Sequence, residues 1–259
     1  LKAFGLDQND SSLSCAFPKG SSVDLKAALE SVQNLYSQTI GVEYMHIDRC
    51  EERAWCMQHF EQLETALPVE RKIDILNSLT KSEGMEKILD RKYKGQKRFS
   101  LEGCESLMPL LDTVLFESTA LGVEEVAIGM AHRGRLNVML NIMGMTAEEL
   151  AEKFSGKING TTTGDVKYHM GYACKRDIAS KKVKISLAFN PSHLETTAAV
   201  ILGACRSRID RDDLSSEMVL PIIIHGDAAV AGQGVVMETA NMAGTPGFTV
   251  GGAIRIVVN

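Results

Sequence analysis

Polar side chains gather at three places in the sequence, each directly after a short apolar run. Residues 131–134 read Ala-His-Arg-Gly, residues 190–195 read Asn-Pro-Ser-His-Leu-Glu, and residues 225–229 read His-Gly-Asp-Ala-Ala. If the apolar runs are strands of one parallel sheet, their carboxyl ends meet at one edge, where open α/β sheets bind ligands. The three clusters are therefore predicted to form one ligand site.

The clusters offer groups suited to a diphosphate and a metal ion. Asn190 followed by proline is typical of a helix start, where unpaired backbone N–H groups bind anions. Arg133 carries a permanent charge suited to phosphate or carboxylate, and Asp227 supplies a carboxylate of the kind that holds Mg²⁺ beside phosphate oxygens. Histidine can act as an acid or base near neutral pH, and histidines stand at positions 132, 169, 193 and 225.

Each of these residues has a simpler explanation when it is taken alone. A histidine after a strand is more often a hydrogen-bonded structural residue, and Gly-Asp after a strand is a common turn. Gly232-Gln233-Gly234 lacks the GxGxxG spacing, and the sequence contains no Gly-Lys-Ser/Thr phosphate loop and no GxSxG nucleophile motif. The coincidence of three clusters is what favours a ligand site.

Residues 100–259 alternate apolar runs with segments of helical spacing, which predicts the α/β fold class. The runs are apolar nearly throughout, as expected for strands covered on both faces, and they span 125–130, 183–189, 219–224 and 253–258. The helices are expected at 104–121, 135–143, 146–154, 191–209 and 234–243. Strands separated by helices indicate a largely parallel sheet with flanking helices and right-handed crossovers.

The first part of the chain, residues 1–99, is predicted to be mainly helical. It holds 5 of the 22 glycines, whereas residues 100–259 hold 17. Helical spacing covers 23–36, 51–67 and 69–89, and the polar stretch 9–20 is expected to be a loop. The predicted domains are therefore a helical segment, 1–99, and an α/β domain, 100–259.

The composition excludes several classes of protein. With 259 residues, 44% hydrophobic and 24% charged, the chain is neither disordered, collagen-like nor a coiled coil. A net charge of -5 and a pI near 5.7 lack the basic surface of a nucleic-acid binder. No apolar run approaches the ~18 residues of a membrane span. The six cysteines are scattered with no zinc-site spacing, and they are expected to be reduced.

Five motifs in this chain closely resemble those of one family. They are KRFSLEG (97–103), MAHRGRLN (130–137), GDVKYHMG (164–171), FNPSHLE (189–195) and HGDAAVAGQG (225–234). Together with VEYMHI (42–47), they resemble the thiamine-diphosphate-dependent decarboxylase component of 2-oxoglutarate dehydrogenase. The resemblance implies that the α/β part is the diphosphate-binding half of a thiamine-diphosphate-binding fold.

The resemblance implies an oxidoreductase that begins a step of the tricarboxylic acid cycle. Such a component decarboxylates 2-oxoglutarate with thiamine diphosphate and Mg²⁺, and it passes the succinyl group to lipoyl groups of dihydrolipoyl succinyltransferase. Dihydrolipoyl dehydrogenase completes the multienzyme complex, which yields succinyl-CoA, CO₂ and NADH. The cofactor supplies the chemistry, while the protein supplies position and electrostatics. The resemblance also implies a homodimer, located in a bacterial cytoplasm or a mitochondrial matrix.

The resemblance also implies which residues bind the cofactor. Asp227 would be a Mg²⁺ ligand, and Ala228 and Ala229 would line the diphosphate. Ser192 and Leu194 would contact the cofactor from the second cluster.

Three further residues would act at or near the reacting centre. His132 would lie beside it, and Arg133 would bind the phosphates of the cofactor or the substrate. His169 would hold the carboxylate of the substrate or manage its protons. His169 does not follow a predicted strand, so the residues alone would not select it.

One departure from the family pattern concerns the last residue. The family strand ends in two asparagines and a glutamine, and the second asparagine is the metal ligand. Asn259 occupies the first of these positions, so the chain from Leu1 to Asn259 is expected to be an internal segment. Because the domain that grips the aminopyrimidine ring would also lie outside it, the segment alone is expected to be inactive.

Two alternatives remain open at this point. The 2-oxoadipate-specific relative shares most of this pattern and differs in a substrate longer by one methylene. The other alternative is a non-catalytic binding or assembly fragment, made of a helical arm and half of a nucleotide-type sheet.

Overall fold

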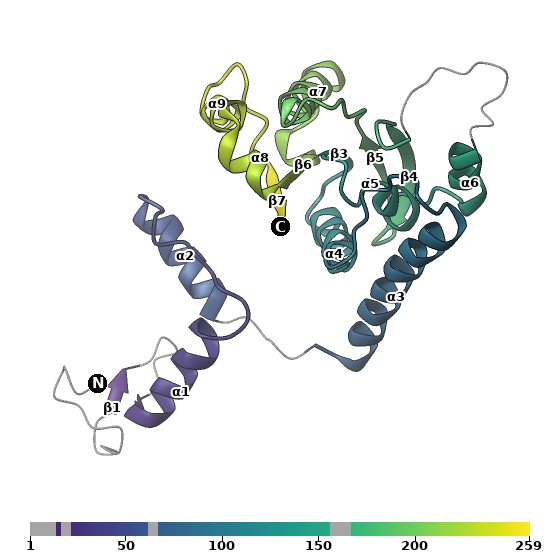
Figure 1. Ribbon diagram of the computed structural model, residues 1–259. Helices are drawn as coiled ribbons and strands as arrows, with labels where there is room; N and C mark the ends of the chain where they lie inside the picture. The colour runs from purple at the N-terminus through teal and green to yellow at the C-terminus, as the bar shows by residue number, and fades with distance from the viewer. Residues whose placement is uncertain (1–13, 17–21, 62–66, 156–166) are drawn as a thin grey trace. The chain divides into compact units, whose positions relative to one another are not determined.

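The computed structural model describes residues 14–16, 22–61, 67–155 and 167–259 (Figure 1). The chain divides into two compact units, Leu1–Pro68 and Val69–Asn259. The predicted domain boundary between residues 99 and 100 stays a prediction. Among the helices of the described residues, none is both long enough and apolar enough to cross a membrane.

The first unit combines a small hairpin with two helices. Strands β1 (Ser14–Ala16) and β2 (Ser22–Asp24) pair antiparallel, although 9–20 was expected to be loop throughout. Helix α1 (Leu25–Tyr36) begins at Asp24, whose side chain accepts a 2.8 Å hydrogen bond from the backbone N of Ala27. Helix α2 is Cys50–Glu61, so the end of the helix predicted at 51–67 falls partly outside the described residues.

The second unit is built on a five-stranded sheet with the order β4-β5-β3-β6-β7. Its strands are β3 (Glu125–Met130), β4 (Tyr172–Ile178), β5 (Lys181–Leu187), β6 (Val219–Gly226) and β7 (Ile254–Val258). Strands β3, β5, β6 and β7 run parallel, and β4 pairs antiparallel with β5 at one edge. The prediction of an α/β fold with a largely parallel sheet is confirmed.

Strand β4 is not among the predicted strands. Exposure alternates along most of it, so it presents a partly buried face and a solvent face, whereas the prediction relied on continuous apolar runs. A two-residue turn, Ala179-Ser180, joins β4 to β5, and both residues have positive φ, of 47° and 62°. This backbone matches the twist of a tight hairpin.

Each helix predicted between residues 69 and 243 has a counterpart in the same order, but most of the predicted ends differ from the observed ones. The observed helices are α3 (Val69–Lys92), α4 (Leu107–Ala120), α6 (Ala147–Ser155), α7 (Thr196–Asp212) and α9 (Gly234–Ala243), with an additional short α8 (Asp227–Gly232) and a 3₁₀ turn η3 (Ser216–Met218). The helix predicted at 135–143 is one α turn, α5 (Arg135–Asn137), followed by the π-helix η2 (Val138–Ile142).

The start predicted for the helix at 191–209 is wrong. Helix α7 begins at Thr196, and residues 191–195 form turns instead. The residue that precedes the first helical position is Glu195, in the left-handed region at φ 67° and without a side-chain cap bond. Asn190 therefore does not cap the helix, and the anion site expected from a helix start at that position does not form there.

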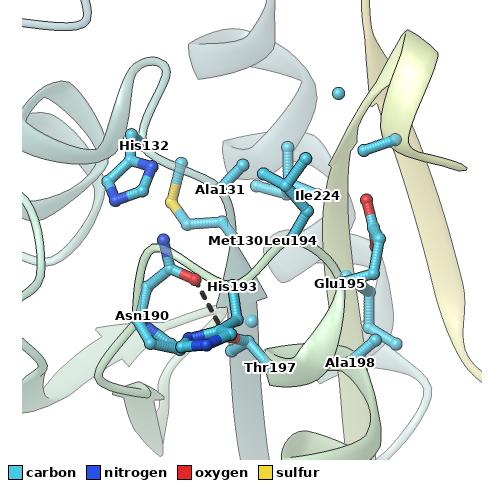
Figure 2. Close-up of a pocket in the computed structure, with 15 residues that line it drawn as sticks. Met130, Ala131, His132, Asn190, His193, Leu194, Glu195, Thr197, Ala198 and Ile224 are labelled. Atoms are coloured by element: carbon cyan, nitrogen blue, oxygen red, sulfur yellow. Dashed lines mark hydrogen bonds between the residues drawn. The ribbon is translucent and has the colours of Figure 1, made fainter. Parts of the chain in front are cut away.

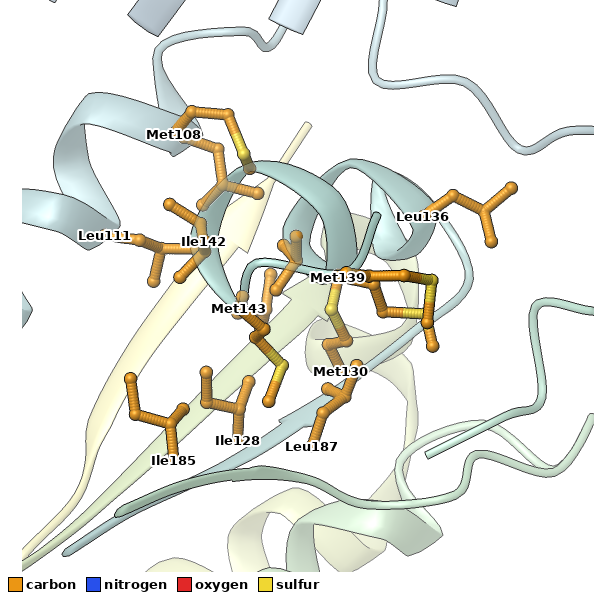
Figure 3. Close-up of a cluster of buried hydrophobic side chains, with 14 of the residues drawn as sticks. Met108, Leu111, Ile128, Met130, Leu136, Met139, Ile142, Met143, Ile185 and Leu187 are labelled. Carbon is orange, nitrogen blue, oxygen red and sulfur yellow. The ribbon is translucent and has the colours of Figure 1, made fainter. Parts of the chain in front are cut away.

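Helices cover both faces of the sheet (Figure 1). On one face, β3 contributes Val126, Ile128 and Met130 to a core shared with α4 and η2, which is rich in methionine (Figure 3). On the other face, Ala127 packs with residues of α7 and β6. Because the residues of β3 alternate between two buried faces, the whole strand reads as apolar.

Gly129 lets α7 approach β3 closely. A Cβ atom at this position would lie 2.7 Å from Cγ1 of Ile201 and 3.2 Å from Cγ2 of Thr197. We expect Gly129→Ala to lower the free energy of unfolding by about 1–3 kcal/mol, because the helix must shift outward. The measurement is urea denaturation of the complete gene product, followed by far-UV circular dichroism.

A matched control lies on α7 itself. A Cβ atom at Gly203 would meet nothing within 4 Å, so Gly203→Ala should raise stability by up to about 1 kcal/mol through helix propensity. Equal effects of the two substitutions would contradict the close approach at Gly129.

Candidate active site

The three polar clusters meet at one edge of the sheet, as predicted. They line a small pocket of about 70 Å³ at the carboxyl ends of the parallel strands β3, β5 and β6 (Figure 2). Residues from all three clusters contribute to its wall, among them His132, Asn190, Leu194, Glu195, Gly226 and Ala229. The convergence follows from the parallel arrangement of these three neighbouring strands.

The expected site residues lie at different distances from this pocket. His132, Leu194 and Ala229 line it. Ser192 lies between the lining residues Pro191 and His193, and Asp227 and Ala228 lie between Gly226 and Ala229. These three are exposed side chains at the edge of the pocket.

The turn after β3 fixes the position of His132. Gly134 has φ 75°, and a Cβ atom there would lie 2.5 Å from Cδ1 of Leu101. The backbone N of Gly134 donates to the carbonyl oxygen of Phe99 at 3.0 Å. A glycine is needed at this turn both for its backbone conformation and for its small volume.

His132 lies in a cluster of rings with one nitrogen unsatisfied. Its ring stacks on Phe99 with centroids 4.9 Å apart, and it meets Tyr168 edge-on at 5.3 Å and His169 at 5.0 Å. Its Nε2 atom is buried without a hydrogen-bond partner among the described residues. Such an atom is the group that a bound ligand would satisfy.

The pKa of His132 is lowered by this environment. Burial disfavours the charged imidazolium, and the charges of His169, Arg135 and Lys97 lower the pKa further. The neutral ring, which can accept a proton or a hydrogen bond, is therefore the form present at neutral pH.

His169 joins the site through the second cluster. Its Nε2 atom lies 3.3 Å from Oγ of Ser192, and its carbonyl oxygen accepts a 3.0 Å hydrogen bond from the backbone N of Asn190. Two residues that only the family resemblance singles out, His169 and Ser192, are thus in contact. The side chain of Asn190 is turned inward, where its Oδ1 accepts from Thr197 at 2.8 Å (Figure 2).

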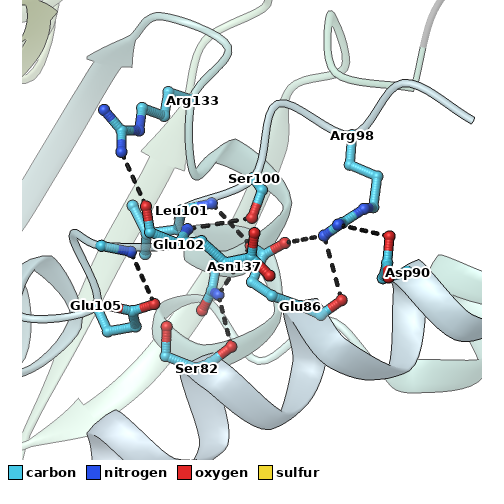
Figure 4. Close-up of polar contacts among 11 residues, drawn as sticks. Ser82, Glu86, Asp90, Arg98, Ser100, Leu101, Glu102, Glu105, Arg133 and Asn137 are labelled. Carbon is cyan, nitrogen blue, oxygen red and sulfur yellow. Dashed lines mark hydrogen bonds and ion pairs between the residues drawn. The ribbon is translucent and has the colours of Figure 1, made fainter.

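Arg133 contacts the loop that precedes α4. Its guanidinium donates a 2.9 Å hydrogen bond to the carbonyl oxygen of Glu102, in the loop that precedes α4 (Figure 4). It does not appear among the residues that line the pocket. In this conformation Arg133 holds that loop, and a role toward phosphate or substrate stays a prediction.

A buried carboxylate anchors the segment that carries Phe99. Glu86 of α3 is 3% exposed, and it accepts hydrogen bonds from Arg98 at 2.9 Å and from the backbone N of Leu101 at 3.1 Å (Figure 4). Nδ2 of Asn137 lies 3.3 Å from the same side chain. Arg98 and Leu101, which flank Phe99 in the KRFSLEG motif, are thereby tied to α3 and, through Asn137, to α5, which keeps Phe99 against His132.

Arg135 is a structural residue that the sequence reading missed. It is fully buried, and its guanidinium donates to the carbonyl oxygens of Met130, Met170 and Ala188. These carbonyls belong to the end of β3, the segment before β4 and the segment after β5. Burial lowers the pKa of Arg135 to about 10, so it remains charged at neutral pH. The sequence signal for this role is that Arg135 precedes the apolar Val138 and Met139 by three and four residues, which places all three on one face of a helix.

We expect Arg135→Met to destabilise the protein by about 3 kcal/mol or more, because one buried and two partly buried carbonyl oxygens lose their donor while the volume is kept. Urea denaturation of the complete gene product measures the change. Arg133→Met, which removes one hydrogen bond of a more exposed arginine, should cost less than about 1 kcal/mol. Similar losses in both variants would contradict the structural role of Arg135.

The ends of β6 and β7 place Asp227 and Asn259 at the edge of the sheet that carries the pocket. Gly226 pairs with Val258 in the parallel ladder, and Asp227 and Asn259 directly follow this pair in the sequence. The described residues contain no group of three or more His, Cys, Asp or Glu side chains that could hold a metal ion. A single carboxylate such as that of Asp227 nevertheless suits Mg²⁺, which takes its remaining ligands from phosphate and water.

Comparison with known proteins defines the class to which this fold and site belong. Residues 78–259 match the model of the family described as dehydrogenase E1 component. The chain belongs to this family.

The relatives narrow the comparison to one kind of E1 component. The chain is 43% identical over 244 residues to the 2-oxoglutarate dehydrogenase E1 component of Haemophilus influenzae, and 46% identical over 240 residues to that of Azotobacter vinelandii. These matches cover 93% and 91% of this chain, but 26% and 25% of the relatives. The chain thus spans about a quarter of the length of the curated relatives it matches.

Proposed function

We propose that this chain is part of a 2-oxoglutarate dehydrogenase E1 component, which decarboxylates 2-oxoglutarate with thiamine diphosphate and Mg²⁺. The observation that carries the proposal is the pocket at the strand ends, which residues from three clusters line and which includes His132, whose Nε2 has no partner among the described residues. The identity of 41–46% to E1 components of this specificity supports it. The sheet would be the diphosphate-binding half of a thiamine-diphosphate-binding fold.

In this proposal the third cluster holds the metal ion and the diphosphate. Asp227 would bind Mg²⁺ through its exposed carboxylate, and Ala228 and Ala229 are small enough to let phosphate approach the backbone of α8. Ser192 and Leu194 would contact the cofactor from the opposite side. Thiamine diphosphate, when bound, supplies the electron sink for decarboxylation of the 2-oxo acid.

The two histidines of the ring cluster would handle protons and the substrate. A neutral His132 can accept a proton at Nε2, the atom that has no protein partner among the described residues. His169, whose Nε2 lies near Oγ of Ser192, would hold the carboxylate of 2-oxoglutarate or relay protons. Arg133 would reach phosphate or substrate only by leaving the carbonyl of Glu102.

The proposal extends to partners and compartment. The succinyl group would pass to lipoyl groups of dihydrolipoyl succinyltransferase, with dihydrolipoyl dehydrogenase completing the complex. We also propose a homodimer, as the family resemblance implies. The named relatives are bacterial, which favours the cytoplasm over a mitochondrial matrix.

The test is decarboxylation by the complete gene product in a dye-linked assay. With thiamine diphosphate and Mg²⁺ present, 2-oxoglutarate should be turned over faster than 2-oxoadipate, and omission of the cofactor should remove the activity. A preference for 2-oxoadipate would assign the protein to that relative instead. Cofactor binding without turnover of either acid would support the non-catalytic alternative.

Residues 1–259 on their own are proposed to be inactive. These residues correspond to about a quarter of the length of the curated relatives. The other three quarters of those proteins have no counterpart in residues 1–259. Measurable turnover by this chain alone would refute that expectation.

A further inference from the structure

A chain of largely buried polar groups begins at Glu195, one of the residues that line the pocket. Nδ1 of His225 is 2.5 Å from Oε2 of Glu195, and Nε2 of the same ring is 3.2 Å from Nη1 of Arg255. Nη2 of Arg255 donates to Oγ1 of Thr239 at 3.0 Å. The side chain of His225 is 0% exposed and that of Glu195 is 6% exposed.

The partners of His225 fix which nitrogen carries the proton. A guanidinium can only donate, so Nε2 must accept the hydrogen bond from Arg255. The proton therefore lies on Nδ1, from which it is donated to the carboxylate of Glu195. A neutral ring thus separates one negative and one positive charge, and each side chain in the chain of groups has a partner.

These groups come from the elements that carry the proposed cofactor contacts. Glu195 ends the cluster that contains Ser192 and Leu194. His225 lies on β6, two residues before Asp227, and Arg255 lies on β7, four residues before Asn259. Glu195 holds a left-handed backbone conformation, at φ 67°, that is uncommon for a residue with a side chain.

The contacts of Glu195, His225 and Arg255 are better suited to fixing the positions of the residues around the pocket than to stabilising the fold. Buried charges lose their hydration, and an ion pair often does no more than offset that loss. By contrast, groups that orient the ligands of a metal ion change its affinity about 10–100-fold when they are replaced. The three side chains link the pocket's second cluster to the carboxyl end of β6, and through Arg255 to the start of β7.

We propose that Glu195, His225 and Arg255 form a clamp of positioning residues, which sets the spacing between Ser192 and Leu194 on one side and Asp227 on the other. The clamp rests on the proposed function, because its purpose is to bind thiamine diphosphate and Mg²⁺. It predicts that the affinity for the cofactor depends on side chains that never touch it.

The experiment measures cofactor affinity in the complete gene product. Glu195→Gln and Arg255→Met should each raise the Kd for thiamine diphosphate, at saturating Mg²⁺, about tenfold in isothermal titration calorimetry. The double variant should be little weaker than either single variant, because one substitution already breaks the chain of groups. Wild-type Kd in both single variants would overturn the clamp, and so would effects that multiply in the double variant.

Matched controls use exposed residues of the neighbouring helices α7 and α9. Glu238→Gln on α9 and Arg211→Met on α7 should leave the Kd unchanged. Thr239→Val keeps the shape of the side chain and removes the acceptor of Arg255, so it tests the clamp if the other variants misfold. A higher Kd in Thr239→Val with an unchanged circular dichroism spectrum supports the clamp, and an unchanged Kd contradicts it.

Asp227→Ala separates the two proposals. If the wild-type protein bound no thiamine diphosphate with Mg²⁺, the proposed function would fail. If the wild type bound it and Asp227→Ala did not, while the clamp variants bound normally, only the clamp would fail.

Discussion

Asp227→Ala should raise the Kd of the complete gene product for thiamine diphosphate in the presence of Mg²⁺ at least about 100-fold. The carboxylate of Asp227 is exposed and directly follows β6, whose last residue, Gly226, pairs with Val258 of β7. A neutral methyl group cannot replace it as a metal ligand or balance the charge of the ion. Isothermal titration calorimetry over a range of Mg²⁺ concentrations measures the loss.

An isosteric pair of substitutions serves as the control. Asp227→Asn keeps an oxygen and loses the charge, so it should weaken binding and shift the Mg²⁺ dependence to higher concentrations. Asp213→Asn makes the same chemical change at an exposed position after α7, and it should have no effect. Normal cofactor binding by Asp227→Ala would remove the third cluster from the proposed metal site.

His132→Phe should lower kcat about 100-fold or more while changing the Kd for the cofactor much less. Phenylalanine also has an aromatic ring that can stack on Phe99 and pack beside Tyr168, but it has no ring nitrogen. The substitution therefore separates proton transfer from packing. Steady-state kinetics with 2-oxoglutarate, together with calorimetry, gives both quantities.

The pH profile checks the same assignment. The pKa of His132 is lowered, so the neutral ring persists until the pH falls below the ordinary histidine value of about 6.5. The acid limb of kcat/KM should therefore lie below that value in the wild type and be absent in His132→Phe. Tyr168→Phe, which keeps the ring, should retain the limb; an unchanged kcat in His132→Phe would sink the assignment.

The central strands β3 and β6 could be predicted because both are buried nearly throughout. Residues 125–130 match β3 residue for residue, and the polar clusters that follow the strands meet as the topology requires. Strand β4 could not be found in this way, because it lies at the edge of the sheet beside β5 and its exposure alternates. Short-range patterns also misplaced the start of α7, since Asn190 bonds to Thr197 instead of capping a helix at that point.

The candidate site was predictable only in part. His132 and Asp227 follow strands, so the sequence pattern alone indicates them. His169 precedes the edge strand β4, and only the family motif draws attention to it. The Glu195–His225–Arg255 contacts join residues 30 apart in sequence. Nothing local in the sequence indicates which of these polar residues is buried, because tertiary packing decides it.

Oxidation of the buried core methionines can report how often the packing of this unit opens. Met108, Met130, Met139 and Met143 are each 2% exposed or less in the core of Figure 3. Peroxide converts a methionine to its sulfoxide only where it can reach the sulfur, so these residues react when the packing between α4, η2 and the sheet opens. The rate at which sulfoxide forms, measured by mass spectrometry, would thus follow the rate of that opening. A bound ligand that holds the strand ends together would lower this rate.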